Sequence, residues 1–514
     1  MSKIARASLT VTFFTLGGMA LSFLSNVVIA AAFGARADMD VFLAATTLPF
    51  FITNILAGSL NYTFIPVFSR FREEAPAETW KMVSTFINLN ALAALAACLA
   101  ASFFAYPIMQ AIAPGFSPEK LARSAELLRW LLPVIVFTVV NELMASVYYS
   151  NHKFAVPSLN KIISPALTMV YVLLFHASMS TKSIALAMLT ASALQTLILA
   201  AGFLRDKEFR YYPSLDFRHE GVRETLTLML PLVAGMLVYQ APPLFDRYFL
   251  SGLGEGSISH VGYASKLMGV ISAVVTSGIS VTIFPRMAHY ASRGETGHLV
   301  GVMSKGMRML MFLSAPFIVG LAVLGKPIVQ LAFERGRFFP SDTTAVCAAL
   351  SVYLISLLAT SSGTVVAQGY YVLRENVKIS AMSATMVPIY VGLCALLIKP
   401  LGYLAIPAAF ALDRCIQTVL ELWVLTKQLP GVQRGLAAYA VKIILVAGAA
   451  CVPFYPLLLT GSVWPRALAF PLAFGGYFAL AVIFKVTEAG MIRQMLRDRF
   501  GRLLKEPAEK TVQF

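Results

Sequence analysis

The sequence predicts an all-α polytopic membrane protein of about fourteen transmembrane helices, arranged as two parallel six-helix lobes plus two C-terminal helices. Three observations predict it: few charged residues, apolar stretches that recur from end to end, and a weak internal repeat. Of the 514 residues, 58% are hydrophobic and 13% are charged, whereas soluble domains carry about 25% charged residues. Too few polar side chains remain to face water everywhere, so lipid must surround most of the chain.

Each apolar stretch is long enough for one bilayer crossing, which needs about 20 residues. Lys3 and Arg6 precede the first stretch, which is too long for the apolar part of a cleavable signal, so we expect a membrane helix there. Several stretches exceed the bilayer span, and we expect these to tilt or to continue as helix into water. The predicted helices cover residues 8–33, 41–69, 82–113, 121–150, 155–178, 182–204, 224–250, 257–290, 297–333, 341–373, 377–398, 402–427, 437–460 and 465–488.

The connecting loops indicate the orientation. Loops on the side of the N-terminus hold most of the Lys and Arg residues, and the opposite loops hold far fewer. Because basic residues accumulate in cytoplasmic loops, we predict a multi-pass protein of the bacterial cytoplasmic (inner) membrane with both termini in the cytoplasm. The same pattern explains the net charge of +16, so we expect membrane lipids and no nucleic acid as partners.

A weak internal repeat predicts the domain organisation. Residues 31–44 resemble residues 251–264, and residues 60–68 resemble residues 279–287, at nearly the same offset. The helix before each match crosses in the same direction, which is typical of parallel repeats that form two lobes around a central cavity. The predicted parts are an N-terminal lobe (1–204), a cytoplasmic linker (205–223), a C-terminal lobe (224–427), helices 13–14 (428–488) and a basic cytoplasmic tail (489–514).

Ionisable residues inside membrane helices are costly and therefore mark candidate transport sites. Lys266 stands among small and apolar residues, where a cation suits a phosphate or diphosphate, although a lysine there can also snorkel to the membrane surface. Neighbouring residues on a helix point about 100° apart, so members of an adjacent acid–base pair can find partners on other helices. We interpret Asp413, Arg414 and Glu421 as packing or ion-pair residues. The candidates are Glu142, Lys161, Asp246, Arg247, Lys266, Asp413, Arg414 and Glu421.

Enzyme signatures are absent from the sequence. It contains no P-loop, no HExxH and no Gly-x-Ser-x-Gly motif, and its six histidines lack metal-ligand spacing. We therefore expect no enzymatic activity, no cofactor and no metal. A secondary transporter driven by a coupling ion or by the membrane potential is the natural expectation.

Four segments together resemble the MurJ (MviN) lipid II flippase family of the multidrug/oligosaccharidyl-lipid/polysaccharide exporter superfamily. The segments are FGARADMDVFLAATTLP at 33–49, YASKLMGVISAVVTSGISVTIFPRM at 263–287, LAFERGRFFPSD at 331–342 and QGYYVLRENVKIS at 368–380. The resemblance covers most of the chain in order. It implies two lobes around a cavity, and a hydrophobic groove lined by helices 13 and 14 for a polyprenyl tail.

The resemblance also implies candidate site residues. Asp40 corresponds to the family's acidic residue after the first helix, and Lys266 corresponds to its cationic residue on helix 8, usually an arginine. Other family arginines are replaced, because Met19, Ser25 and Thr53 stand at their aligned positions. Fewer cations are thus available for an anionic group. The expected substrate-binding residues are Lys266, Arg247, Asp246, Asp40, Ser25, Asn26 and Thr53.

The resemblance implies a flippase for an undecaprenyl-diphosphate-linked saccharide. Its first expected substrate is the peptidoglycan precursor lipid II, moved from the cytoplasmic to the periplasmic leaflet by alternating access. Three alternatives stay open: a flippase for another lipid-linked repeat unit, of O-antigen or exopolysaccharide; a cation-coupled drug antiporter, with Glu142 as its buried carboxylate; and a scaffold that transports nothing. We expect the protein to be a monomer.

Overall fold

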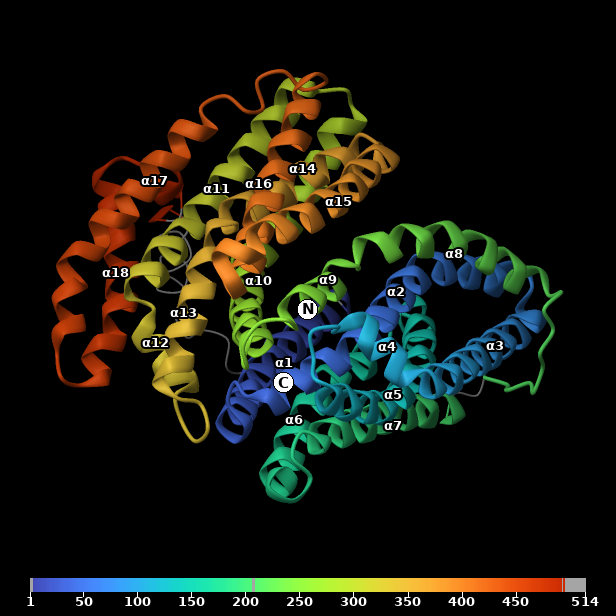
Figure 1. Ribbon diagram of the computed structural model, residues 1–514. Helices are drawn as coiled ribbons and strands as arrows, with labels where there is room; N and C mark the ends of the chain where they lie inside the picture. The colour runs from blue at the N-terminus through green and yellow to red at the C-terminus, as the bar shows by residue number, and fades with distance from the viewer. Residues whose placement is uncertain (1–2, 206–208, 492, 495–514) are drawn as a thin grey trace, which may run out of the picture. The chain divides into compact units, whose positions relative to one another are not determined.

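The computed structural model describes residues 3–205, 209–491 and 493–494 (Figure 1). These residues form helices and connecting turns and contain no strand. The helices are α1 (Lys3–Phe33), α2 (Ala37–Glu74), α3 (Pro76–Phe103), α4 (Ala105–Ile112), α5 (Pro118–Ser150), α6 (Ala155–Met179), α7 (Lys182–Arg205), α8 (Glu220–Tyr239), α9 (Pro242–Leu250), α10 (Ser257–Ser292), α11 (Thr296–Leu324), α12 (Lys326–Phe333), α13 (Pro340–Ile355), α14 (Leu357–Val372), α15 (Asn376–Leu401), η1 (Gly402–Leu404), α16 (Ala405–Thr426), α17 (Leu436–Cys451), η2 (Val452–Leu459) and α18 (Val463–Ile483).

The predicted fold class is confirmed. Within the described residues, thirteen helical segments are long and apolar enough to cross a membrane. One of these segments, Asn376–Leu425, contains both α15 and α16, which correspond to two predicted crossings. The segments therefore agree with about fourteen transmembrane helices.

Four of the long predicted helices are broken rather than continuous. We expected the longest stretches to tilt or to extend into water, but 82–113 breaks at Phe104, 224–250 at Gln240, 297–333 at Gly325 and 341–373 at Ser356. The second break precedes Pro242 and Pro243, which lack the N–H group that a continuing helix needs. Isolated prolines are tolerated elsewhere, because Pro133 and Pro316 lie inside helices that continue.

The contacts between residues divide the chain into two compact units. The first unit contains residues 1–263, 333–345 and 383–409, and the second contains residues 264–332, 346–382 and 410–514. The division falls within α10 and does not follow the predicted lobe boundaries at 204 and 224, which stay a prediction. The basic tail predicted at 489–514 and part of the linker predicted at 205–223 lie outside the described residues.

Helices of the first unit approach closely through small residues. A Cβ atom on Gly18 of α1 would lie 2.9 Å from both the Cβ and the backbone oxygen of Lys161 on α6. Lys161 Nζ donates a hydrogen bond to Thr15 Oγ1 of α1 at 2.9 Å. Membrane helices associate by such close packing and by interhelical hydrogen bonds, so the Gly-rich part of α1 serves its contact with α6.

The segment before α8 is fixed to α3 by polar contacts. Tyr212 N donates to Ser84 Oγ at 3.1 Å, and Asn88 Nδ2 donates to Ser214 O at 3.1 Å. Glu224 at the start of α8 pairs with Arg70 at the end of α2. The described part of the predicted linker therefore follows the surface of the first unit.

In the second unit, the two C-terminal helices pack on α11 (Figure 1). Tyr477 OH of α18 donates a hydrogen bond to Phe312 O at 3.0 Å. Phe317 contacts the rings of Phe470 and Phe474, with centroids 6.0 and 5.3 Å apart. This aromatic contact attaches α18 to the unit.

We expect Gly18→Leu to lower the free energy of unfolding by about 1–3 kcal/mol, because the larger side chain must displace the α6 backbone. The measurement is the thermal midpoint of the purified protein in detergent. Gly235→Leu is the matched control, since a Cβ atom there meets nothing within 4 Å. Equal midpoints for the two variants would contradict the proposed role of Gly18.

Candidate functional site

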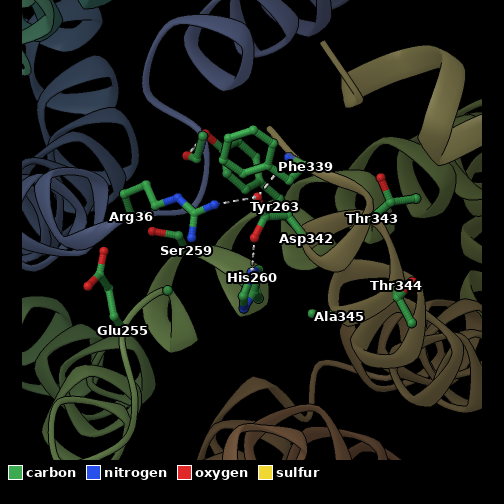
Figure 2. Close-up of polar contacts among 12 residues, drawn as sticks. Arg36, Glu255, Ser259, His260, Tyr263, Phe339, Asp342, Thr343, Thr344 and Ala345 are labelled. Carbon is green, nitrogen blue, oxygen red and sulfur yellow. Dashed lines mark hydrogen bonds and ion pairs between the residues drawn. The ribbon is translucent and has the colours of Figure 1, made fainter. Parts of the chain in front are cut away.

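A polar cluster with a buried centre joins three turns of the first unit. The turns are α1–α2, α9–α10 and α12–α13, and Figure 2 shows several of their side chains converging. We call this the turn cluster and define it by Asp40, Glu255, Ser259, His260 and Asp342. Its members are separated by up to 302 positions in the sequence but hydrogen-bond within one region.

Asp40 caps a helix other than its own. It is 3% exposed. Its Oδ2 accepts a hydrogen bond from Gly256 N at 2.7 Å, and its Oδ1 accepts from Ser259 N at 2.8 Å and from Ser259 Oγ at 2.6 Å. The first N–H groups of a helix have no partner within the helix and carry partial positive charge. The Asp40 carboxylate thus supplies the N-terminal cap of α10.

Glu255 makes the reciprocal contact. The Ala37 N–H at the first residue of α2 donates to Glu255 Oε1 at 3.0 Å. Asp40 lies in the first turn of α2, and Glu255 lies just before α10. Each helix therefore receives its capping carboxylate from the segment of the other, which fixes the two N-termini against each other.

Asp342 brings the third turn into the cluster. It is 2% exposed and lies in the first turn of α13. His260 Nε2 lies 3.0 Å from Asp342 Oδ1, and Phe339 N donates to Asp342 Oδ2 at 2.9 Å. Arg36 Nη2 lies 3.9 Å from the same Oδ2, with its guanidinium over the Phe339 ring (Figure 2). The carboxylate thus contacts both a histidine of α10 and an arginine of the α1–α2 turn.

The turns approach too closely for ordinary side chains. Gly34 has a φ of 62°, and a Cβ atom on it would overlap the Arg337 carbonyl. Arg337 N donates to Ala31 O at 2.8 Å, and Tyr263 OH donates to Gly34 O at 3.1 Å. Glycine adopts positive φ without steric cost, so Gly34 permits the backbone contact that brings the α12–α13 turn against α1.

The sequence identified one member of the turn cluster and missed four. Asp40 was predicted from the family resemblance, whereas Glu255, Ser259, His260 and Asp342 were not. A signal was present: the repeat pairs residues 31–44 with 251–264, which places Asp40 and His260 at equivalent positions. The missing information was the contact between the repeats, which no local pattern encodes.

Asp246 finds its partner on another helix, as the pattern of adjacent charges allows. Tyr390 OH on α15 donates a hydrogen bond to Asp246 Oδ1 on α9. The Nε atom of neighbouring Arg247 is buried and has no hydrogen-bond partner among the described residues. Both contacting helices belong to the first unit at these residues.

The remaining predicted site residues do not gather in the described contacts. Thr53 Oγ1 donates to Phe50 O at 3.2 Å, and Asn26 Nδ2 donates to Ser22 O at 2.8 Å, both within their own helices. Ser25 is buried in α1. Lys266 has an exposed side chain on α10, two turns beyond Ser259 in the second unit.

Asp413 and Arg414 bond each other, although adjacent positions point apart. Arg414 Nε and Nη2 donate to Asp413 Oδ2 at 2.9 and 2.5 Å. Gln417 Nε2 donates to Glu421 Oε1 at 2.7 Å. The expected ion pair of Asp413 and Arg414 is therefore confirmed, and the interpretation of Glu421 as a packing residue stays a prediction.

The turn cluster can hold the three turns together reversibly. It contains no covalent link, and its strength comes from hydrogen bonds to carboxylates in a buried setting, which are stronger than bonds between neutral groups. Among the described residues, no group of three His, Cys, Asp or Glu side chains could hold a metal ion. The described contacts therefore hold the three turns against one another.

We expect Asp40→Asn to destabilise the protein by about 1–3 kcal/mol, because an amide cannot accept all three hydrogen bonds and leaves buried N–H donors unpaired. Thermal unfolding in detergent measures the loss. Glu119→Gln serves as the control, since Glu119 is exposed in the first turn of α5. An Asp40→Asn midpoint equal to that of the control would show that the cluster does not hold the turns.

Comparison with known proteins gives consistent results. The family model described as lipid II flippase MurJ matches residues 29–473. The chain is 25% identical over 514 aligned residues to a probable lipid II flippase MurJ of Bdellovibrio bacteriovorus, covering 96% of this chain and 97% of the relative. It is 23% identical over 431 residues to the lipid II flippase MurJ of Burkholderia cenocepacia, covering 81% and 83%.

Solved structures show the same fold. A lipid II flippase MurJ in an inward closed conformation is similar with a TM-score of 0.81 at 21% identity, over 93% of this chain and 98% of that chain. A multidrug resistance MATE family transporter of the MOP superfamily in an inward-facing conformation is similar with a TM-score of 0.67 at 13% identity, over 81% and 96%. The match of the family model to residues 29–473 shows that this chain belongs to the lipid II flippase MurJ family.

Proposed function

We propose that this protein moves lipid II, an undecaprenyl-diphosphate-linked saccharide, from the cytoplasmic to the periplasmic leaflet. The observation that carries the proposal is the match of the family model over residues 29–473. The family is one of transporters rather than of catalytic enzymes. Similar relatives are named lipid II flippases, and their alignments extend over most of both chains.

The turn cluster suits alternating access. We propose that its buried hydrogen bonds hold the three turns together in one state and exchange for water in the other. Breaking them exposes Asp40 and the first N–H groups of α10 to water, which can hydrogen-bond both. A substrate that binds the two states differently can shift such an equilibrium. The turns would lie on the periplasmic side.

Diphosphate binding would rest on few cations. Lys266 is our first candidate because it lies on α10, the helix that the turn cluster caps. Arg247 is the second, because its buried Nε has no hydrogen-bond partner among the described residues. Asp246, Ser25, Asn26 and Thr53 would supply polar contacts to the saccharide or its water. Lysine and arginine both form charge-assisted hydrogen bonds to phosphate.

The setting of the protein completes the proposal. We propose cytoplasmic termini, because the basic loops lie on the side of the N-terminus. A coupling ion or the membrane potential would drive transport, and the protein would act as a monomer in the inner membrane. The helices α17 and α18 would border the polyprenyl tail, since they present exposed apolar side chains such as Leu445 and Leu472.

We expect this chain to sustain growth of a bacterium whose own lipid II flippase is depleted. Lys266→Ala should lower lipid II exposure on the periplasmic leaflet about tenfold or more, because a charge-assisted hydrogen bond is lost. Lys266→Arg should restore it, and Lys378→Ala, an exposed lysine paired with Glu375, is the control. If Lys266→Ala exposes as much lipid II on the periplasmic leaflet as the unmodified protein, Lys266 is not part of the binding site.

Failure of the unmodified chain to complement, with the protein confirmed in the membrane, would contradict lipid II as the substrate. A flippase for another lipid-linked repeat unit, of O-antigen or exopolysaccharide, would then be the next candidate. Complementation by this chain in a host that lacks such a repeat-unit flippase would distinguish the two.

The structural likeness to a multidrug transporter favours one further candidate, a cation-coupled drug antiporter. In that case we expect the protein to expel cationic dyes under a proton gradient, and Glu142→Gln to abolish the efflux. Dye retention equal to that of cells without the protein would exclude this activity.

A further inference from the structure

A pocket of about 510 Å³ lies within the first unit, between the N-terminal part of α5 and the α6–α7 turn. Its size falls in the range of about 300–1,000 Å³ that is typical of small-molecule sites. Arg123, Glu126 and Trp130 line it from α5, and Ser178, Ser180 and Lys182 line it from the α6–α7 turn and the helix ends beside it. None of these residues belongs to the turn cluster or to the predicted substrate site.

The charges of the pocket balance. Arg123 pairs with Asp38, and Lys182 Nζ lies 2.5 Å from Glu126 Oε1. A phosphate bound here would face the Glu126 carboxylate beside cations that are already paired, and a cation would face Arg123 and Lys182. The pocket therefore favours a ligand without net charge.

The paired groups keep hydrogen-bonding capacity. The side chains of Arg123, Glu126 and Lys182 are 43%, 47% and 38% exposed. A carboxylate accepts at about four sites, a guanidinium donates five hydrogens and an ammonium donates three. After one ion pair each, these groups still present both donors and acceptors, which suits a ligand rich in hydroxyl groups.

Trp130 adds an aromatic surface. It is 37% exposed and lines the same pocket. An indole combines a broad apolar face with one polar edge. A pyranose ring has the complementary arrangement, since its C–H groups form an apolar face and its hydroxyl groups surround the rim. Aromatic face and charged rim together match a saccharide.

The wall of the pocket includes a strained residue. Ser180 has a φ of 48° and a ψ of −139°, a conformation that side-chain-bearing residues rarely adopt. Its Oγ donates to Asp38 Oδ2 at 3.2 Å, and its backbone oxygen accepts from Ser183 Oγ at 2.6 Å. Such strain persists only where the surroundings enforce it, and it concentrates at ligand sites. The hydrogen bond from Ser180 helps to hold Asp38 against Arg123.

We propose that this pocket binds a neutral saccharide of one or two rings, stacked on Trp130 and hydrogen-bonded by Arg123, Glu126 and Lys182. Its link to transport rests on the proposed function. The pocket lies at the end of the first unit where α2 begins, because Asp38, the ion-pair partner of Arg123, is in the first turn of α2. That end is the one proposed to face the periplasm, so the site would contact the saccharide headgroup after it crosses.

The test is binding of diacetylchitobiose, a neutral two-ring saccharide, to the full chain in detergent, measured by saturation-transfer NMR and calorimetry. We expect binding by the unmodified protein, about tenfold weaker binding by Trp130→Ala, and recovery in Trp130→Phe. Trp464→Ala is the matched control, because Trp464 is 72% exposed on α18 of the second unit. Thermal midpoints verify that each variant is folded.

A second variant tests the charge balance. Glu126→Gln leaves Lys182 unpaired, so we expect weaker saccharide binding together with new binding of inorganic phosphate. The proposal would be overturned if the unmodified protein bound no saccharide, or if Trp130→Ala bound it as tightly as the unmodified protein. Phosphate binding by the unmodified protein would overturn it in favour of an anion site.

The outcome is independent of the complementation assay, because a soluble saccharide is used and nothing is transported. If the protein complements growth but binds no saccharide, only the proposal for the pocket is overturned. Failed complementation with intact saccharide binding overturns only lipid II as the transported substrate.

Discussion

The arrangement of the turns in the first unit depends on one buried carboxylate. An ionised Asp40 in a buried position is costly unless it is hydrogen-bonded, and the first N–H groups of α10 are costly unless they find acceptors. Asp40 accepts hydrogen bonds from Gly256 N and Ser259 N. The carboxylate and the N–H groups therefore offset each other's cost of burial. The exposed Glu255 carboxylate likewise accepts the Ala37 N–H of α2. This exchange sets where α10 begins, and hence where Lys266 lies along it.

The same constraint explains the composition of the turns. Because the capping carboxylates are short, the two backbones must approach closely, and Gly256 at a φ of 85° permits it, since a Cβ atom there would lie 2.6 Å from Ala35 O. Tyr263, Phe333 and Phe338 then fill the space behind the polar contacts, with ring centroids 5.5 to 5.7 Å apart. The hydrogen bonds of the buried Asp40 and Asp342 are strengthened because little water reaches them, while their small number leaves the cluster breakable.

Away from the turns, lipid changes what holds helices together. Apolar side chains gain little by leaving lipid for protein, so close packing and interhelical hydrogen bonds specify the contacts. Gly18 against α6 shows the first, and Asn141 shows the second, since its Nδ2 donates to Gln195 Oε1 of α7 at 3.3 Å. The pocket beside Trp130 differs from both, because its charged side chains stay partly exposed even though they form ion pairs.

The sequence by itself determined the helical class, the approximate helix positions and the family, because hydropathy and motif order are local along the chain. It also identified Asp40, and it marked Asp246 as an intramembrane charge. Only the tertiary structure decided the partners: Ser259 for Asp40, Tyr390 for Asp246 and Asp342 for His260. These contacts join residues 82 to 219 positions apart, and no local pattern specifies which distant groups meet. Helix breaks such as that at Ser356 were likewise hidden, because both sides of the break are equally apolar.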